Sequence, residues 1–157
     1  MDSTTPSHTA PLDLLKSLSG LEFLQRIIDG RLPQALMAQT LRFAAIEVEA
    51  GKVMFEGIPG PEHYNPIGTV HGGYACTLLD SAMSCAVQSM CAAGMAYTTL
   101  ELKVNLVRPI TTETGPVRAE GSVIHVGRRT GTAEGKLLDA SGKLLAHGTT
   151  TCLIFPL

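Results

Sequence analysis

The chain has 157 residues, a formal net charge of −2, 17% charged residues and 45% hydrophobic residues. This length suits one domain with a hydrophobic core of its own. Lys and Arg are few and scattered, which excludes the basic surface expected of a nucleic-acid-binding protein. The four cysteines form no C-x-x-C pair, so we expect reduced thiols and a cytoplasmic location.

The first forty residues predict a tail followed by helix. Residues 1–11 are rich in Ser, Thr and Pro and lack the apolar run of a signal peptide, so we expect a disordered tail there. From Leu12 to Ile28 the apolar residues recur with a helical period, which ends at Asp29 and Gly30. We therefore expect an N-terminal helical segment over residues 12–40, with one or two amphipathic helices.

The remainder, residues 41–157, is predicted to be one domain of strands around a helix. Alternating runs between Leu41 and Phe55 indicate a β-hairpin, with Ala50 and Gly51 in its turn. A loop rich in Gly, Pro, His and Asn then leads to a long apolar helix from about Gly72 to Cys91. Further strand-like runs follow over residues 98–107, where Leu100, Leu102, Val104 and Leu106 alternate, and over 117–126, 130–138 and 143–155.

The apolar helix is nearly free of charge, as a membrane span would be. Its content of Ala, Ser, Cys and Gly, and Asp80 within it, favour a buried helix of a soluble protein without a membrane partner. The order of elements predicts an α+β fold, an antiparallel sheet of five to six strands wrapped around the long central helix. Such a sheet has an open edge that a partner subunit commonly covers.

Two features of the long helix suggest chemistry. Gly72 and Gly73 at its start leave backbone N–H groups uncapped, and a helix N-terminus stabilises a carbonyl oxygen that gains negative charge. The Gly72 N–H is therefore a candidate donor, although two glycines can equally serve close packing at a loop-to-helix junction. Asp80 is a lone carboxylate among apolar residues, which suits a general base or a carboxylate satisfied by Thr77 or Ser84 one turn away.

Gly72 and Asp80 lie eight residues apart, which is about 12 Å along one helix. One carbonyl carbon cannot contact both groups at that separation. If both groups act on the same carbonyl group, they must come from two copies of the helix, which predicts a site across a dimer interface.

The motif Asn65-x-x-Gly68-x-x-His71-Gly72-Gly73, followed by Asp80, resembles the hotdog-fold thioesterases of the phenylacetate-degradation (PaaI-like) and THEM2-like group. The later segment Val123 to Thr130 is similar to a strand-turn-strand of the same group. The resemblance covers residues from about Leu41 to Phe155. It implies a hotdog homodimer, paired into a homotetramer, that hydrolyses an acyl-coenzyme A (acyl-CoA) thioester without a cofactor other than the coenzyme A of its substrate.

The resemblance also implies roles for single residues. Asp80 would attack the thioester or activate water, Asn65 would orient the water or thioester from the other subunit, and Gly72 N–H would polarise the carbonyl. Ser84, or the hydroxyl of Thr98 in the pair Thr98-Thr99, occupies a place where relatives put an assisting hydroxyl. Each of these two hydroxyls can also be an ordinary one that is bonded locally.

The remaining candidates concern binding. In the resembled group the histidine at the place of His71 usually holds the loop, and His71 and Gly73 would shape the place that receives the substrate. Arg128 and Arg129, at a predicted strand turn, could bind the phosphates of coenzyme A or be a solvated turn. The histidines have no metal-ligand spacing, so we expect no metal.

Two other functions remain open from the sequence. The chain could bind acyl-CoA without catalysis, since hotdog domains also serve as ligand modules. It could instead be a hotdog hydratase acting on enoyl or hydroxyacyl thioesters, which would need a His paired with a carboxylate. His71 and Asp80 would lie about 13 Å apart if both were on the helix, so such a pair is less natural. Few aromatic residues are present, which hints at an aliphatic acyl group.

Overall fold

The computed structural model describes residues 10–157. The predicted tail over residues 1–11 therefore lies almost entirely outside the described residues. The N-terminal segment contains two helices within residues 12–28, α1 (Leu12–Ser17) and α2 (Gly20–Ile28), and a further short helix, α3 (Leu36–Thr40). The rest contains β1 (Phe43–Glu49), β2 (Lys52–Gly57), the 3-10 turn η1 (Pro61–His63), α4 (Gly72–Ser89), β3 (Met95–Leu106), the turn η2 (Thr112–Thr114), β4 (Val117–Val126), β5 (Thr130–Asp139) and β6 (Leu144–Pro156).

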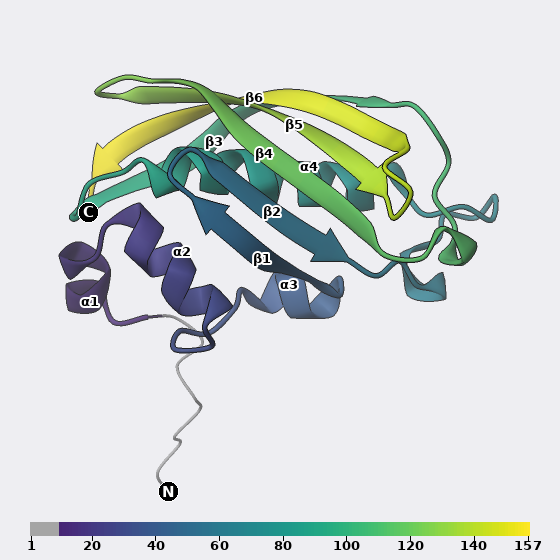
Figure 1. The fold of residues 1–157 in the computed structure, drawn as a ribbon, viewed down its shortest axis with the longest axis horizontal. Coiled ribbons are helices and arrows are strands. Elements are labelled where there is room, and N and C mark those ends of the chain that lie inside the picture. The colour runs from purple at the N-terminus through teal and green to yellow at the C-terminus, as the bar shows by residue number, and fades with distance from the viewer. Residues whose placement is uncertain (1–9) are drawn as a thin grey trace, which may run out of the picture.

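The strands form one six-stranded antiparallel sheet in the order β1-β2-β4-β5-β6-β3. The sheet arches over α4, and the N-terminal helices lie on the side opposite to the sheet (Figure 1). This architecture confirms the predicted hotdog fold, including its long central helix. Within residues 10–157, β1 and β3 are the two edges of the sheet, so each of them has one side without a strand partner.

Helix α4 fills the concave face of the sheet. Leu78, Leu79, Ala82 and Met83 are fully buried, and these positions repeat along the helix with the spacing of one face. No helix among residues 10–157 is both long and apolar enough to cross a membrane.

Glycines in the strands bring the sheet close to α4. A Cβ on Gly121 of β4 would lie 2.2 Å from the Ala82 carbonyl oxygen, and one on Gly135 of β5 would lie 2.8 Å from Cγ of Met83. Any larger residue at Gly121 would therefore push against helix backbone, which cannot move aside as a side chain can. The absence of side chains at these positions sets the short distance between the two layers.

The N-terminal helices are attached to the same core. Ser19 caps α2 in a capping box with Glu22. At the next residue the Gly20 N–H donates to the Cys91 carbonyl, just beyond α4, at 3.0 Å. A Cβ on Gly20 would lie 1.7 Å from the Gln88 carbonyl oxygen, so glycine allows α2 to begin directly against the end of α4.

Candidate active site

Asp80 lies on the part of α4 that the sheet leaves uncovered. Its carboxylate is half-buried, and its Oδ1 accepts a hydrogen bond of 2.9 Å from the hydroxyl of Thr99 on β3. This bond orients the carboxylate, because Thr99 belongs to a strand that packs against the helix.

The hydroxyl beside Asp80 is that of Thr99 and not that of Thr98, its neighbour, which we proposed from the sequence. The pairing of β3 with β6 shifts register between Thr99 and Glu101, so Leu100 is the extra residue of a bulge and is 59% exposed. A bulge exchanges the faces on which odd and even residues lie. The inward face that includes Leu102 and Val104 therefore continues to Thr99, not to Thr98.

Ser84, one turn after Asp80, donates a hydrogen bond of 3.3 Å to the hydroxyl of Tyr97. The thiol of Cys85 lies 3.8 Å from the same hydroxyl. Burial raises the pKa of Cys85 to about 12 and the pKa of Tyr97 well above its ordinary value. Near neutral pH both groups are therefore protonated, so the thiol beside the carboxylate is a poor nucleophile.

A cavity of about 750 Å³ opens beside this group. Its polar wall comes from α4 and β3 and includes Asp80, Ser84 and Thr99. The other walls are mostly apolar and come from the N-terminal helices, β1 and β2. The carboxylate thus faces a space large enough for a small-molecule ligand.

The start of α4 forms a second polar group. His71 caps the helix, because its Nδ1 accepts a hydrogen bond of 2.9 Å from the Gly73 N–H. Among residues 10–157 the Gly72 N–H has no hydrogen-bond acceptor. It is half-exposed and lines a cavity of about 290 Å³ with Asn65, His71 and Arg108. The Gly72 N–H is therefore free at the start of the helix, where the partial positive charge of its N-terminus is greatest.

Asn65 organises the loop that precedes the helix. Its Oδ1 accepts from the N–H groups of Ile67 and Thr69, at 3.1 and 3.3 Å, and its Nδ2 donates to the Thr69 hydroxyl at 3.0 Å. Gly68, at φ +87°, makes the tight turn possible. An amide NH₂ carries two N–H donors, so one remains for a ligand after the bond to Thr69.

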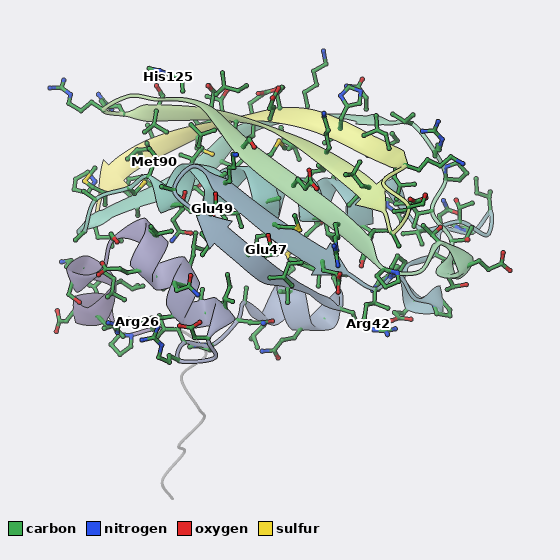
Figure 2. The ribbon with its side chains drawn as sticks, viewed as in Figure 1. Arg26, Arg42, Glu47, Glu49, Met90 and His125 are labelled. Atoms are coloured by element: carbon green, nitrogen blue, oxygen red, sulfur yellow. The ribbon has the colours of Figure 1, made fainter. Side chains whose placement is uncertain are left out.

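Sequence reasoning missed the role of His63, which attaches this loop to the first turn of α4. Its ring is buried and stacks on Tyr74 in the first turn of α4, with 4.5 Å between the ring centroids. Its Nδ1 accepts from the Gly60 N–H at 2.9 Å, and its carbonyl accepts from the His71 N–H at 2.8 Å. The residue that caps α4 is thus held by a buried histidine. Arg42, at the start of β1 (Figure 2), adds an ion pair with the neighbouring Glu62 at 3.1 Å.

The two polar groups lie apart within the chain. They occupy α4 at Gly72 and at Asp80, about 12 Å along the helix axis, and the two cavities share no lining residue. The structure brings Asp80 together with Thr99, and Asn65 with His71 and Gly72, but it does not bring the two sets to one point within one chain.

The remaining candidates lie at the surface. Arg128 and Arg129 are exposed in the turn between β4 and β5. The next residue, Thr130, pairs with Leu153, which pairs with Thr98, so the turn is at the end of the sheet where β3 begins. Residues 10–157 contain no group of three or more side chains that could bind a metal ion.

Tyr97 was not selected from the sequence, and Thr99 was named there only as the second residue of the pair Thr98-Thr99. Both are on the inward face at the start of β3, two positions apart. The spacing of two would have linked them. However, the strand begins at Met95, before the expected residue 98, and its bulge cannot be located from the alternation of apolar residues.

A curved antiparallel sheet around one long helix, with a carboxylate in the middle of the helix and a free N–H at its start, defines a hotdog-type protein equipped for acyl chemistry. Residues 67–146, just over half of the chain, match the family model described as the thioesterase superfamily. The chain belongs to the thioesterase superfamily. The predicted enzyme class, a thioester hydrolase, is thereby confirmed at the level of the family.

Individual relatives agree with this family. The chain is 25% identical over 118 residues to a 1,4-dihydroxy-2-naphthoyl-CoA hydrolase of Listeria monocytogenes, a match that covers 75% of this chain and 94% of the relative. It is 41% identical over 69 residues to a protein of Halobacterium salinarum that is provisionally named an esterase, covering 43% of this chain and 44% of that relative.

Among solved structures, the chain resembles a phenylacetic acid degradation-related protein of Ralstonia eutropha JMP134, provisionally named a thioesterase. The TM-score is 0.76 at 28% identity, and the match covers 83% of this chain and 98% of the other. These similarities confirm the predicted phenylacetate-degradation-like group of hotdog thioesterases.

Proposed function

We propose that this protein hydrolyses an acyl-CoA thioester at a site that two subunits share. Asp80 with Thr99 comes from one subunit, and Gly72 N–H with Asn65 comes from the other. The observation that carries this proposal is the placement of a half-buried carboxylate and an unpaired helix N–H about 12 Å apart on one rigid helix. Neither group alone would both activate the nucleophile and stabilise the oxyanion.

The free edge of the sheet supports the pairing of two subunits. Leu100, Leu106 and Val107 lie at β3 and are between 46% and 59% exposed, and the backbone of this edge strand has free hydrogen-bonding groups. A second copy that adds its own β3 would bury these side chains. A two-fold arrangement would then place each Asp80 towards the helix start of the partner.

The chemistry assigns one task to each group. Asp80 removes a proton from water as the oxygen forms a bond to the thioester carbon, or it attacks that carbon itself and is released by water in a second step. Gly72 N–H donates to the carbonyl oxygen as its negative charge develops, and Asn65 orients the water or the thioester. The C–S bond then breaks, the electron pair goes to sulfur, and the products are a free acid and coenzyme A.

Coenzyme A is bound, in this proposal, with its phosphates near Arg128 and Arg129, whose guanidinium groups suit phosphate oxygens. The functional unit is at least a dimer, in the cytoplasm, and pairs into a tetramer. A hydratase is less well supported, because the Nδ1 of His71 accepts a hydrogen bond from the Gly73 N–H and is not free to take a proton from a substrate.

The first test is thiol release from a panel of aliphatic and aromatic acyl-CoAs, with an Asp80→Ala variant as the comparison. We expect turnover by the native chain and a loss of about 10²–10⁴-fold in the variant, the range of a missing general base. Binding of acyl-CoA without release of thiol would instead identify a noncatalytic binding protein.

The shared site has its own test, which uses two inactive variants. Asp80→Ala and Gly72→Pro each damage both sites of a homodimer, but a mixed dimer contains one site with both native groups. Random exchange of subunits should therefore restore about a quarter of the native activity, since half of the dimers are mixed and half of their sites are intact. A mixture that stays as inactive as its components would refute the composite site.

A further inference from the structure

We infer that the N-terminal helical segment forms the wall of an acyl-chain pocket and selects substrates with an extended, uncharged aliphatic acyl group. This inference rests on the proposed thioesterase function and adds the substrate class. The helices α1–α3 precede the residues 67–146 that define the family match, so the matched region by itself does not supply this wall.

The segment is docked to the core at two places. At one end, Gly20 is fixed to the C-terminal end of α4 by its hydrogen bond to the Cys91 carbonyl. At the other, Ala38 of α3 is 5% exposed and belongs to the same core cluster as Phe43 of β1. Between the two attachments, α2 and α3 contribute lining residues to the cavity of about 750 Å³, whose other walls come from β1, β2, β3 and α4. These helices lie on the side opposite to the sheet (Figure 1).

The face that α2 turns towards this cavity is apolar. Phe23, Leu24 and Ile27 line it, and their spacing places them on one side of the helix. Arg26 does not line the cavity and lies on the side of α2 away from the sheet (Figure 2). The helix therefore contributes hydrocarbon to the cavity and keeps its charge outside.

Charge in the cavity is confined to one residue. Among residues 10–157, Asp80 is the only charged side chain that lines it, and no Lys or Arg of this range is present there. An acyl group that ends in a carboxylate would have no cation to pair with in this space and would be disfavoured. Apart from Gln34, the polar lining residues lie on α4 and β3, on the side of the Asp80 carboxylate, whereas the opposite walls are mostly hydrocarbon, which suits an acyl chain with one polar end.

The part of the wall that the N-terminal segment supplies favours an aliphatic chain, since Phe23 is the one aromatic residue that it adds, whereas Phe43, Phe55 and Tyr97 line the sheet side. Leucines, Ile27, Met37 and alanines supply most of the N-terminal part of the lining. Phe43 and Phe55 contact each other, with their ring centroids 5.8 Å apart. The volume is within the roughly 300–1,000 Å³ of typical small-molecule sites and far exceeds the need of an acetyl group.

The experiment fills the pocket and uses a matched control on the same helix. Ile27→Trp adds bulk on the cavity side of α2, and Arg26→Trp adds a similar bulk on its outer side. For each protein, kcat/KM is measured with acetyl-, butanoyl-, decanoyl-, palmitoyl-, phenylacetyl- and benzoyl-CoA. We expect the native chain to prefer decanoyl- or palmitoyl-CoA, and Ile27→Trp to lower the ratio of decanoyl to butanoyl kcat/KM by about tenfold or more. Arg26→Trp should leave this ratio unchanged.

Two further measurements make each outcome decisive. If Ile27→Trp does not fold by circular dichroism, Ile27→Ala enlarges the same pocket and should shift the preference towards palmitoyl-CoA. Calorimetric binding of a non-hydrolysable decanoyl thioether analogue of CoA tests the pocket without catalysis. Tight binding that Ile27→Trp weakens about tenfold and Arg26→Trp does not would support the pocket even if no thioester is hydrolysed.

Three results would overturn the inference. The first is a native preference for acetyl-CoA or for the two aryl-CoAs. The second is an unchanged chain-length profile in both folded Ile27 variants. The third is hydrolysis of short acyl-CoAs together with no measurable binding of the decanoyl analogue, which would leave the thioesterase proposal standing and remove the acyl pocket.

Discussion

Replacing Gly72 by proline tests the helix N–H directly, because proline is the residue that lacks this group. The backbone at residue 72 can accommodate proline. Gly72 is the first residue of α4, where proline is favoured, and His71 before it has φ −60° and ψ 136°, the extended conformation that a residue before proline adopts. The Gly72 N–H has no acceptor within residues 10–157, so no hydrogen bond of the fold is lost.

Gly72→Ala is the matched control. It retains the N–H but, like proline, adds a Cβ, which would meet Leu106 Cδ1 at 2.6 Å. That atom is the end of a side chain and can move aside. The difference between the two variants therefore isolates the N–H group from the added carbon.

We expect Gly72→Pro to lower kcat by about 10²–10³-fold relative to Gly72→Ala, which corresponds to about 2.7–4 kcal/mol of oxyanion stabilisation. KM should change little, because the oxyanion exists only in the transition state. The thermal unfolding temperature of Gly72→Pro should be equal to or higher than that of Gly72→Ala, since proline restricts the unfolded chain. Equal kcat values in two folded variants would refute the role of this N–H.

Three more outcomes follow from the structure. Thr99→Val removes the hydrogen bond to Asp80 and should lower kcat about tenfold, whereas Thr98→Val should change it less than about twofold; equal effects in thiol-release assays would contradict the assignment. Burial raises the pKa of Tyr74 from 10.0 to about 12, so its contribution to stability is complete below pH 10 and is lost as the pH rises towards 12. Tyr74→Phe should therefore flatten the fall in urea stability over that interval, and an unchanged fall would argue against it. Gly121→Ala should destabilise the fold by about 2 kcal/mol or more, because its Cβ would meet the Ala82 carbonyl at 2.2 Å. Gly127→Ala, whose nearest contact would be 3.4 Å, should unfold at nearly the native urea concentration.

The alternation of apolar residues predicted the strands well, because each strand buries one face against α4. The turn at Ala50 and Gly51 and the start of the long helix at Gly72 were also predicted correctly, since glycine marks both. The helix α3 was not predicted from the sequence as a separate element. It has only five residues and no side-chain cap, so too few positions carry its period.

The site was predicted only as far as single residues on α4. The spacing of Gly72 and Asp80 follows from helix geometry, so the sequence was sufficient for it. The partner of Asp80 depends on the register of β3 and on the bulge at Leu100, and register is a property of strand pairing that one strand does not encode alone. The acyl-pocket wall likewise joins residues from α2 and α3 to Asp80, far along the chain, and only packing brings them together.

The strand glycines that face α4 restrict how the sequence can vary. In most cores the strictest positions hold large side chains, because shortening them leaves a void. Here the closest approaches of the sheet to α4 involve Gly57, Gly121, Gly131 and Gly135, where an added Cβ would lie between 2.2 and 2.8 Å from the helix residues that face them. A survey of tolerated substitutions should find that the smallest residues of this core are among the least replaceable, while neighbouring leucines accept other apolar side chains. As the sequence diverges, the short distance between the sheet and α4 should therefore be retained more strictly than the identity of the apolar side chains between them.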